Sequence, residues 1–198
     1  MTASLLATGI VLLMVVINDK GKRPLLRLAI YAPLLVPQVS LVLGLQAVLV
    51  WFWLDGTWLA MLWIHALFIC PFAYLIIAPA AAAMDQRYIA VAASLGAGPG
   101  SRYLRVALPM LAPAITTALF VGVSVSVALY LPSLFAGGGR ITTVTLEAVA
   151  LASGGSRQMA GVAAMLQLAI PLLIFILLRL WQHRRYGHFA GMRAGGLH

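Results

Sequence analysis

Five long apolar stretches dominate this chain and leave few folds open to it. They run over residues 1–17, 33–54, 58–83, 110–131 and 159–180. A helix of about 20 consecutive apolar residues crosses the hydrocarbon core of a bilayer. Only 9% of the 198 residues are charged, against about 25% in a soluble domain. The sequence therefore predicts an integral membrane protein with five transmembrane helices.

Helices are favoured over a transmembrane β-barrel, because barrel strands alternate apolar and polar residues over about ten positions. Residues 122–127 do alternate, but the sequence around them stays apolar from Ile115 to Leu131. The expected fold class is all-α, with one transmembrane domain over residues 1–198. The first stretch resembles the core of a signal peptide, yet it lacks a preceding basic residue and a small-residue cleavage site. We expect it to be a true first helix or the remainder of a longer N-terminal segment.

The basic residues predict how the helices are oriented. Eleven of the thirteen lysines and arginines lie on one side of the predicted membrane: Lys20, Lys22, Arg23, Arg27, Arg87, Arg102, Arg105, Arg179, Arg184, Arg185 and Arg193. Cytoplasmic loops carry such an excess. We therefore expect the N-terminus outside, the C-terminus inside, and a basic cytoplasmic tail over 181–198. Because topology explains the net charge of +9, no nucleic-acid partner is expected.

Four tryptophans support the same orientation. Trp51, Trp53, Trp58 and Trp63 surround the turn at residues 55–57, on the side that has few basic residues. Tryptophan is enriched where a membrane protein meets the headgroup layer. These side chains are expected to form an aromatic belt at the outer interface of the lipid bilayer.

The inner connection over residues 84–108 is too long for a tight turn. Residues 88–95 are good helix formers, and Gly96, Gly98, Pro99 and Gly100 end the helix that they predict. A second short helix is expected over 101–107, before Pro109. The residues alone allow two interpretations. The segment is either a connecting hairpin whose arginines touch anionic lipid, or a helix that docks in the groove of a partner.

This connection resembles the EAA loop of permease subunits of binding-protein-dependent ABC importers with the type I, methionine-permease-like fold. The family pattern is Glu-Ala-Ala, three residues, Gly, nine residues, then Ile or Val, any residue, and Leu-Pro. Gly96 is followed by nine residues and then by Val106, Ala107, Leu108 and Pro109. Leu95, Gly96 and Ala97 also match the usual Leu-Gly-Ala. The first three positions fall on Ala90, Val91 and Ala92, so the acidic residue is missing here.

Other elements extend the resemblance over about residues 25–175. Residues 33–37 (PLLVP) and 70–72 (CPF) look like the Leu-Pro and Pro-Phe elements of the family. Residues 135–143 (FAGGGRITT) resemble the glycine-rich outer loop of the branch that serves iron(III), thiamine and polyamines.

The resemblance implies a permease subunit of the bacterial inner membrane that works by alternating access. It also implies that the EAA-like loop, with the residues that match the family pattern, inserts into a cleft of a cytoplasmic ATPase and couples the permease to it. Its implied partners are a dimer of cytoplasmic ABC ATPases, a second permease subunit or half, and a periplasmic or surface substrate-binding protein. ATP belongs to the ATPase, and no cofactor, metal or catalytic residue is expected in this chain. Both lysines, Lys20 and Lys22, lie outside any phosphate-binding loop pattern.

Polar residues inside the predicted spans are candidates for the translocation path, since such residues usually face an interior. Ser126 and Tyr130 are the first candidates, with Ser124 and Gln46 beside them. Packing between helices is the competing interpretation, because small residues promote close approach. His65 is expected to be a hydrogen-bonded interior residue rather than a ligand.

Two other classes are weaker. A half-sized secondary transporter, or a channel-like protein without an ATPase, is disfavoured because no carboxylate lies deep in a span and five spans do not divide into equal halves. An intramembrane enzyme needs convergent groups. His65 and Cys70 are five residues apart on one helix and point in different directions.

Overall fold

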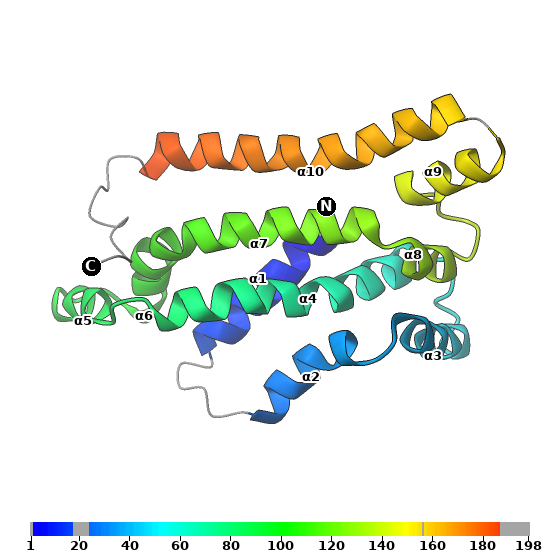
Figure 1. Cartoon of the computed structure of the whole chain (residues 1–198). Helices are drawn as coiled ribbons and strands as arrows, with labels where there is room; N and C mark the ends of the chain where they lie inside the picture. The colour runs from blue at the N-terminus through cyan, green and yellow to red at the C-terminus, as the bar shows by residue number, and fades with distance from the viewer. Residues whose placement is uncertain (1, 18–23, 156, 187–198) are drawn as a thin grey trace.

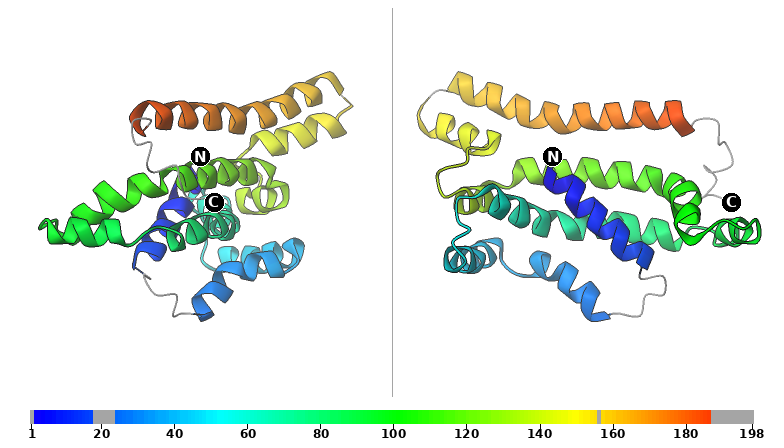
Figure 2. Two further views of the ribbon diagram at one scale, coloured as in Figure 1. Left: turned by 60° about the vertical axis from the view of Figure 1, so that its left-hand side comes forward. Right: turned by 180° about the vertical axis from the view of Figure 1, so that it is seen from behind.

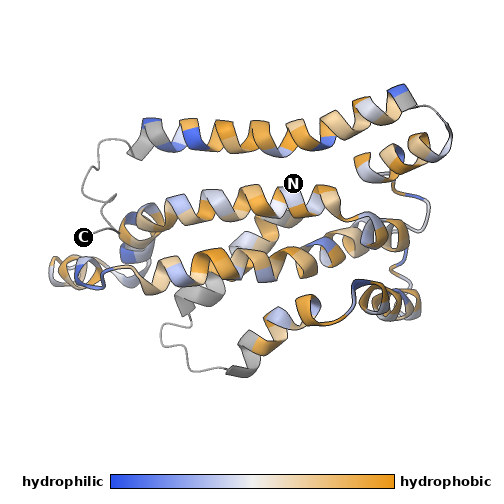
Figure 3. Ribbon diagram, in the orientation of Figure 1, coloured by the Kyte–Doolittle hydropathy of each residue, from blue (hydrophilic) through white to orange (hydrophobic). Residues whose placement is uncertain are grey.

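The computed structural model describes residues 2–17, 24–155 and 157–186, and in these ranges the chain is helical without strands (Figure 1). This confirms the all-α class. Among the described residues, three helical segments are long and apolar enough to cross a membrane: Trp58–Ala82, Pro99–Ala128 and Gln158–Gln182. Apolar residues cover these segments along most of their length (Figure 3). The chain is thus a polytopic membrane protein.

The centre of the bundle consists of α1 (Thr2–Ile17), α4 (Trp58–Ala82) and α7 (Leu108–Ala128). Helix α1 crosses the other two obliquely (Figure 2). Small side chains make the contacts: Ala3 and Ala7 pack with Ala66 and Ile69, and further along, Val11 packs with Ala73, Ile77 and Ala118. Alanines let helix backbones approach closely, which is how helices associate where lipid removes the hydrophobic driving force.

The two ends of the bundle differ. One end, on the left of Figure 1, carries α5 (Arg87–Ser94), α6 (Pro99–Arg102) and the C-terminal end of α10 (Arg157–Tyr186). We call it the loop end. The opposite end carries α3 (Gln38–Trp51), α8 (Tyr130–Gly137) and α9 (Val144–Ser153), and we call it the tryptophan end. Arg87, Arg102 and Arg105 thus lie at the loop end, as the predicted charge asymmetry requires. The predicted tail over 181–198 falls mostly on residues 187–198, and Lys20, Lys22 and Arg23 also lie outside the described residues.

The predicted span over 33–54 contains a sharp break. Residues 24–35 form α2 (Pro24–Leu35), and α3 begins at Gln38; the two helices are bent by 113°. Pro37 explains the break, because it disfavours the helical conformation at Val36 and has no N–H to donate. Helix α3 then lies across the tryptophan end beside α8 (Figure 1), where Val42 is buried against Met61 and Ile64. Counted as one span, the bent pair brings the candidate crossings to four.

The prediction of a separate short helix over 101–107 is wrong. After α6, the π-helical segment η1 (Tyr103–Ala107) continues directly into α7, so residues 99–128 form one helix of 30 residues. The N–H of Leu108 donates to the carbonyl of Tyr103, five residues back. Proline in an α-helix clashes with the carbonyl four residues before it. The wider π turn before Pro109 relieves this clash, and the helix does not end there.

At the tryptophan end, α7 ends at Ala128, and Leu129 breaks the helix with φ −76° and ψ 85°. Helix α8 follows and ends at Gly138, whose φ of +52° is left-handed. A Cβ atom at Gly138 would lie 3.2 Å from Cα of Gly56 in the turn before α4. Both turns therefore need glycine at this contact. Helices α9 and α10 pack together and lie against α7 (Figure 2).

Candidate functional site: an exposed helix at the loop end

Helix α5 projects beyond the ends of α4 and α7, and all views place it outside the bundle (Figures 1 and 2). None of its residues is buried. It packs against the short segments that follow it, α6 and η1. The predicted helix over 88–95 is confirmed, within one residue at each end.

Local hydrogen bonds hold α5 in place. At its start, the Asp85 carboxylate accepts from the backbone N–H of Arg87 at 2.9 Å. At its end, Gly96 has φ +79°; its N–H donates to the carbonyl of Ala93, and the N–H of Ala97 donates to that of Ala92, both at 3.0 Å. This pair of bonds is a Schellman motif, which favours glycine at the left-handed position.

The turn after α5 is also tied to the long helix. Nε of Arg102 donates to the carbonyl of Ala97 at 2.7 Å. Pro99 begins α6, where its missing N–H costs nothing. A short, hydrogen-bonded turn therefore connects α5 to the helix that contains α7.

One face of α5 is apolar and open. Tyr88, Val91 and Leu95 are 54, 58 and 81% exposed, and Leu104 in η1 is 68% exposed. The first three are spaced i, i+3 and i+7, which places them on one side of a helix. The long helices expose apolar side chains along the lengths that can cross a membrane. The apolar face of α5, in contrast, lies on a helix that is too short to cross one. An exposed apolar face of this kind is typical of a surface that contacts another protein or the membrane.

The structure divides the predicted coupling residues into two sets. Ala90, Val91, Leu95 and Gly96 are exposed on α5 or its cap, whereas Ala92 and Ala97 are half-buried toward the turn. The second half of the motif belongs to the stem of the long helix. Val106 and Pro109 are half-buried there, and Leu108 lines an apolar groove with Gly9, Leu12 and Leu111. The coupling role of both sets stays a prediction.

The predicted path residues on α7 have partners inside the chain. Ser126 Oγ lies 2.8 Å from His65 Nδ1, and Ser124 Oγ donates to the carbonyl of Phe120 at 2.9 Å. His65 is buried, as expected for an interior residue, and its Nε2 lies 2.9 Å from Ser133 Oγ. Ser126 thus takes part in a contact between helices. Helix packing is the interpretation that competes with a role in the translocation path.

The other two path candidates lie at the tryptophan end, on packed helices. Tyr130 is half-buried at the first position of α8. Gln46 is half-buried on α3, and its buried Oε1 has no hydrogen-bond partner among the described residues. A path that includes these side chains stays a prediction.

Sequence reasoning did not single out Ser133 or Thr145. The Ser133 hydroxyl donates to the carbonyl of Leu129 at 2.5 Å, and the Thr145 hydroxyl donates to the carbonyl of Val127. Together they satisfy carbonyls left open where α7 ends. Ser133 lies four residues after the break, a spacing that allows such a bond, but only the fold brings Thr145 to Val127.

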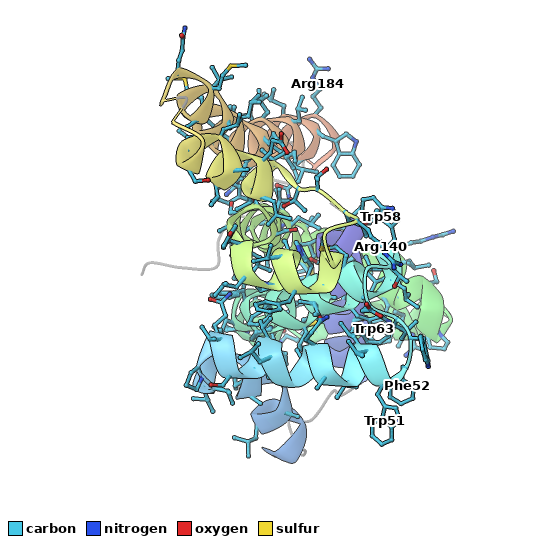
Figure 4. The ribbon with its side chains drawn as sticks, turned by 90° about the vertical axis from the view of Figure 1, so that its right-hand side faces the viewer. Trp51, Phe52, Trp58, Trp63, Arg140 and Arg184 are labelled. Atoms are coloured by element: carbon cyan, nitrogen blue, oxygen red, sulfur yellow. The ribbon has the colours of Figure 1, made fainter. Side chains whose placement is uncertain are left out.

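The tryptophans that are predicted to form an aromatic belt lie at the tryptophan end. Trp51, Trp58 and Trp63 are exposed, and Phe52 stacks beside Trp51 with ring centroids 6.1 Å apart. Figure 4 views this end directly and shows these side chains along one side of it, with Arg140 among them. The position of an actual membrane interface stays a prediction.

Comparison with known proteins agrees with this architecture. Residues 3–188 match the family described as binding-protein-dependent transport system inner membrane component. The chain is 37% identical over 177 residues to the inner membrane ABC transporter permease protein YnjC of Escherichia coli strain K12. The match covers 89% of this chain and 35% of YnjC, so the chain spans about a third of that relative's length. With its apolar helices, the chain is a multi-pass protein of the bacterial inner membrane. It belongs to the family of inner membrane components of binding-protein-dependent transport systems.

Proposed function

We propose that this chain is part of the permease of an ATP-driven solute importer, and that a cytoplasmic ABC ATPase docks on α5. The observation that supports this most directly is the open apolar face of Tyr88, Val91 and Leu95 on a capped helix outside the bundle. The family match gives the class of transporter. In this proposal the loop end is cytoplasmic, as the arginines around it predict.

The long helix is the element that would carry motion from the ATPase across the membrane. Residues 99–128 form one helix of 30 residues, which is about 45 Å long at 1.5 Å per residue. Closure of an ATPase dimer would move α5, and the Arg102 bond to Ala97 passes that movement into the helix. At the far end the same helix meets α8 at Leu129. Rigid-body movement of packed helices is a common way to switch between two states.

Other parts of the transporter come from partner chains or from a further part of a longer chain. A second permease half would complete the path, and a substrate-binding protein would deliver solute at the tryptophan end. ATP would bind to the ATPase, and this chain would bind no cofactor. Its match to about a third (35%) of YnjC is compatible with a permease that contains more helices than are described here. The predicted iron, thiamine and polyamine branch stays a prediction.

Co-elution with an ATPase tests the proposal. The ATPase encoded beside this chain is purified with it in detergent, and Leu95→Glu is compared with Leu95→Ala and with Leu168→Ala as a control. Leu168 is 75% exposed, similar to Leu95, but it lies on α10. Leu95→Glu is expected to abolish co-elution and Leu95→Ala to reduce it, with no change for Leu168→Ala. If the wild-type chain binds no ATPase, or if Leu95→Glu binds as well as wild type, α5 is not the docking helix.

A further inference from the structure

We infer that the ATPase cleft that receives α5 has an apolar floor and an acidic rim, so that this loop is recognised through its arginines. The inference rests on the proposed docking of an ATPase at α5 and specifies the chemistry of that partner. It follows from three features of the loop: its apolar face, its unpaired charges and the residue at position 90.

The apolar face of α5 is the reason to expect an apolar floor in the ATPase cleft. Tyr88, Val91 and Leu95 form one side of α5, and Leu104 is exposed in the segment that packs against it. Leaving four large apolar side chains in water is unfavourable, and burying them against apolar groups is favourable in proportion to the apolar area removed from water. A partner with a polar floor would lose this contribution.

The arginines of the loop are the reason to expect an acidic rim around the cleft. Residues 84–108 contain three arginines and one aspartate, a net charge of +2. Arg87 and Arg105 are exposed, and neither has an ion-pair partner in the part of the chain that the structure describes. Arg102 is bonded to Ala97, and the Asp85 carboxylate accepts from a backbone N–H. Two guanidinium groups therefore remain free to bind carboxylates, for which their planar fork is well suited.

The geometry of α5 places this charge next to the apolar face. Arg87 and Val91 are four residues apart, and Arg87 and Ala90 are three apart, so both pairs are neighbours on the helix surface. Arg105 follows the exposed Leu104 directly. Ala90 is exposed and stands where the family pattern has its glutamate. Because alanine carries no charge, this face has no carboxylate at position 90 that could pair with basic residues in a partner's cleft.

The direction in which one substitution changes ATPase binding distinguishes a cleft with an acidic rim from a basic cleft. In Ala90→Glu, the new carboxylate lies within reach of Arg87 on the same helix and adds negative charge to the face. With an acidic rim it weakens ATPase binding, because like charges oppose each other and Arg87 is partly neutralised. With a basic cleft it strengthens binding. Ala90→Gln serves as the uncharged control of nearly the same size.

We would measure association and dissociation rates of the ATPase on the full chain in phosphatidylcholine nanodiscs, between about 0.05 and 0.5 M salt. This lipid has no net charge, so a salt effect cannot come from anionic headgroups. Wild type is expected to associate more slowly as salt rises. Arg87→Gln and Arg105→Gln are each expected to lower the association rate several-fold at low salt and to flatten its salt dependence. Arg140→Gln, exposed at the tryptophan end, is the control and should change neither.

The outcomes separate this inference from the proposed function. If the ATPase does not bind wild type at any salt concentration, the docking proposal itself fails. If the ATPase binds wild type and Leu95→Glu abolishes binding, α5 is the docking helix. In that case the acidic rim is still wrong if Ala90→Glu strengthens binding, or if the arginine variants bind like wild type. Weaker binding of Ala90→Glu, Arg87→Gln and Arg105→Gln, with Ala90→Gln and Arg140→Gln unchanged, supports the inference. Equal thermal unfolding of all variants confirms that they are folded.

Discussion

Nε2 of His65 in α4 lies 2.9 Å from Oγ of Ser133 in α8. The hydroxyl of Ser133 donates its one proton to the carbonyl of Leu129, so at His65 it accepts, and Nε2 carries the proton. Nδ1 of the neutral ring then accepts from the hydroxyl of Ser126 at 2.8 Å. A single buried imidazole therefore joins α4, α7 and α8 at the break that ends the long helix.

Replacing His65 with phenylalanine is expected to destabilise the protein by about 1–3 kcal/mol, because it removes two buried hydrogen bonds while keeping a ring of similar size. Thermal unfolding in detergent measures this as a lower Tm. Ser124→Ala is the control, since in the part of the chain that the structure describes that hydroxyl bonds to Phe120 of its own helix, and its Tm should be close to wild type. Equal losses in both variants would contradict a specific role for the imidazole.

Gly96 is expected to tolerate alanine poorly, although a Cβ atom there would meet nothing within 4 Å. Its φ of +79° is left-handed, which costs a residue with a Cβ atom about 1–2 kcal/mol. Gly98 has an equally open site and an ordinary φ of −66°, so Gly98→Ala is the matched control. Hydrogen exchange should show faster exchange of the α5 amides in Gly96→Ala only. Similar protection in the two variants would mean that the Schellman turn does not hold α5.

Gly138 is expected to tolerate alanine less well than Gly139. Both have positive φ, of +52° and +72°, so alanine is strained at each. A Cβ at Gly138 also meets Cα of Gly56 at 3.2 Å, whereas at Gly139 it meets nothing within 4 Å. The additional loss for Gly138→Ala is expected to be about 1–3 kcal/mol, the usual range for overpacking. Thermal unfolding of the two variants gives this difference directly, and a difference near zero would show that the two turns separate easily.

The orientation is tested by labelling introduced cysteines with a membrane-impermeant maleimide. Cys70 is the only cysteine in the chain, so Cys70→Ala supplies the background for Leu95→Cys and Trp51→Cys. Both positions are 81% exposed, at opposite ends of the bundle. If the loop end is cytoplasmic, Trp51→Cys is labelled in spheroplasts and Leu95→Cys only in inverted vesicles. The reverse pattern would place α5 outside the cell and exclude docking of a cytoplasmic ATPase.

Features that depend on neighbouring residues were predictable from the sequence. The apolar runs predicted membrane helices because crossing a bilayer requires a certain number of apolar residues, whatever those helices pack against. Helix α5 and its cap were predictable for a similar reason. Gly96 followed by Gly98 and Pro99 ends a helix through the φ angles that those residues allow, without help from distant parts of the chain.

Proline was a weaker guide, because its effect depends on what the surrounding structure can accommodate. Pro109 was expected to end a short helix, but a π turn absorbs it and the helix continues. Pro37 lies inside the predicted span over 33–54, and the chain bends there by 113°. That bend is supported by burial of Val42 against Met61 and Ile64 of α4, which follow it by about twenty residues.

The sequence by itself thus determined the membrane-protein class, the position of the exposed loop helix and the unequal charge of the two ends, since each depends on composition or on residues within one or two turns. The tertiary structure decided what the buried polar residues do. From the sequence, Ser126 is a candidate for the path and for a packing contact, and only the fold brings His65, 61 residues earlier, within 2.8 Å of it. A hydroxyl in a helix can bond to its own backbone, to another helix or to a solute, and only the groups that the fold places beside it select among these.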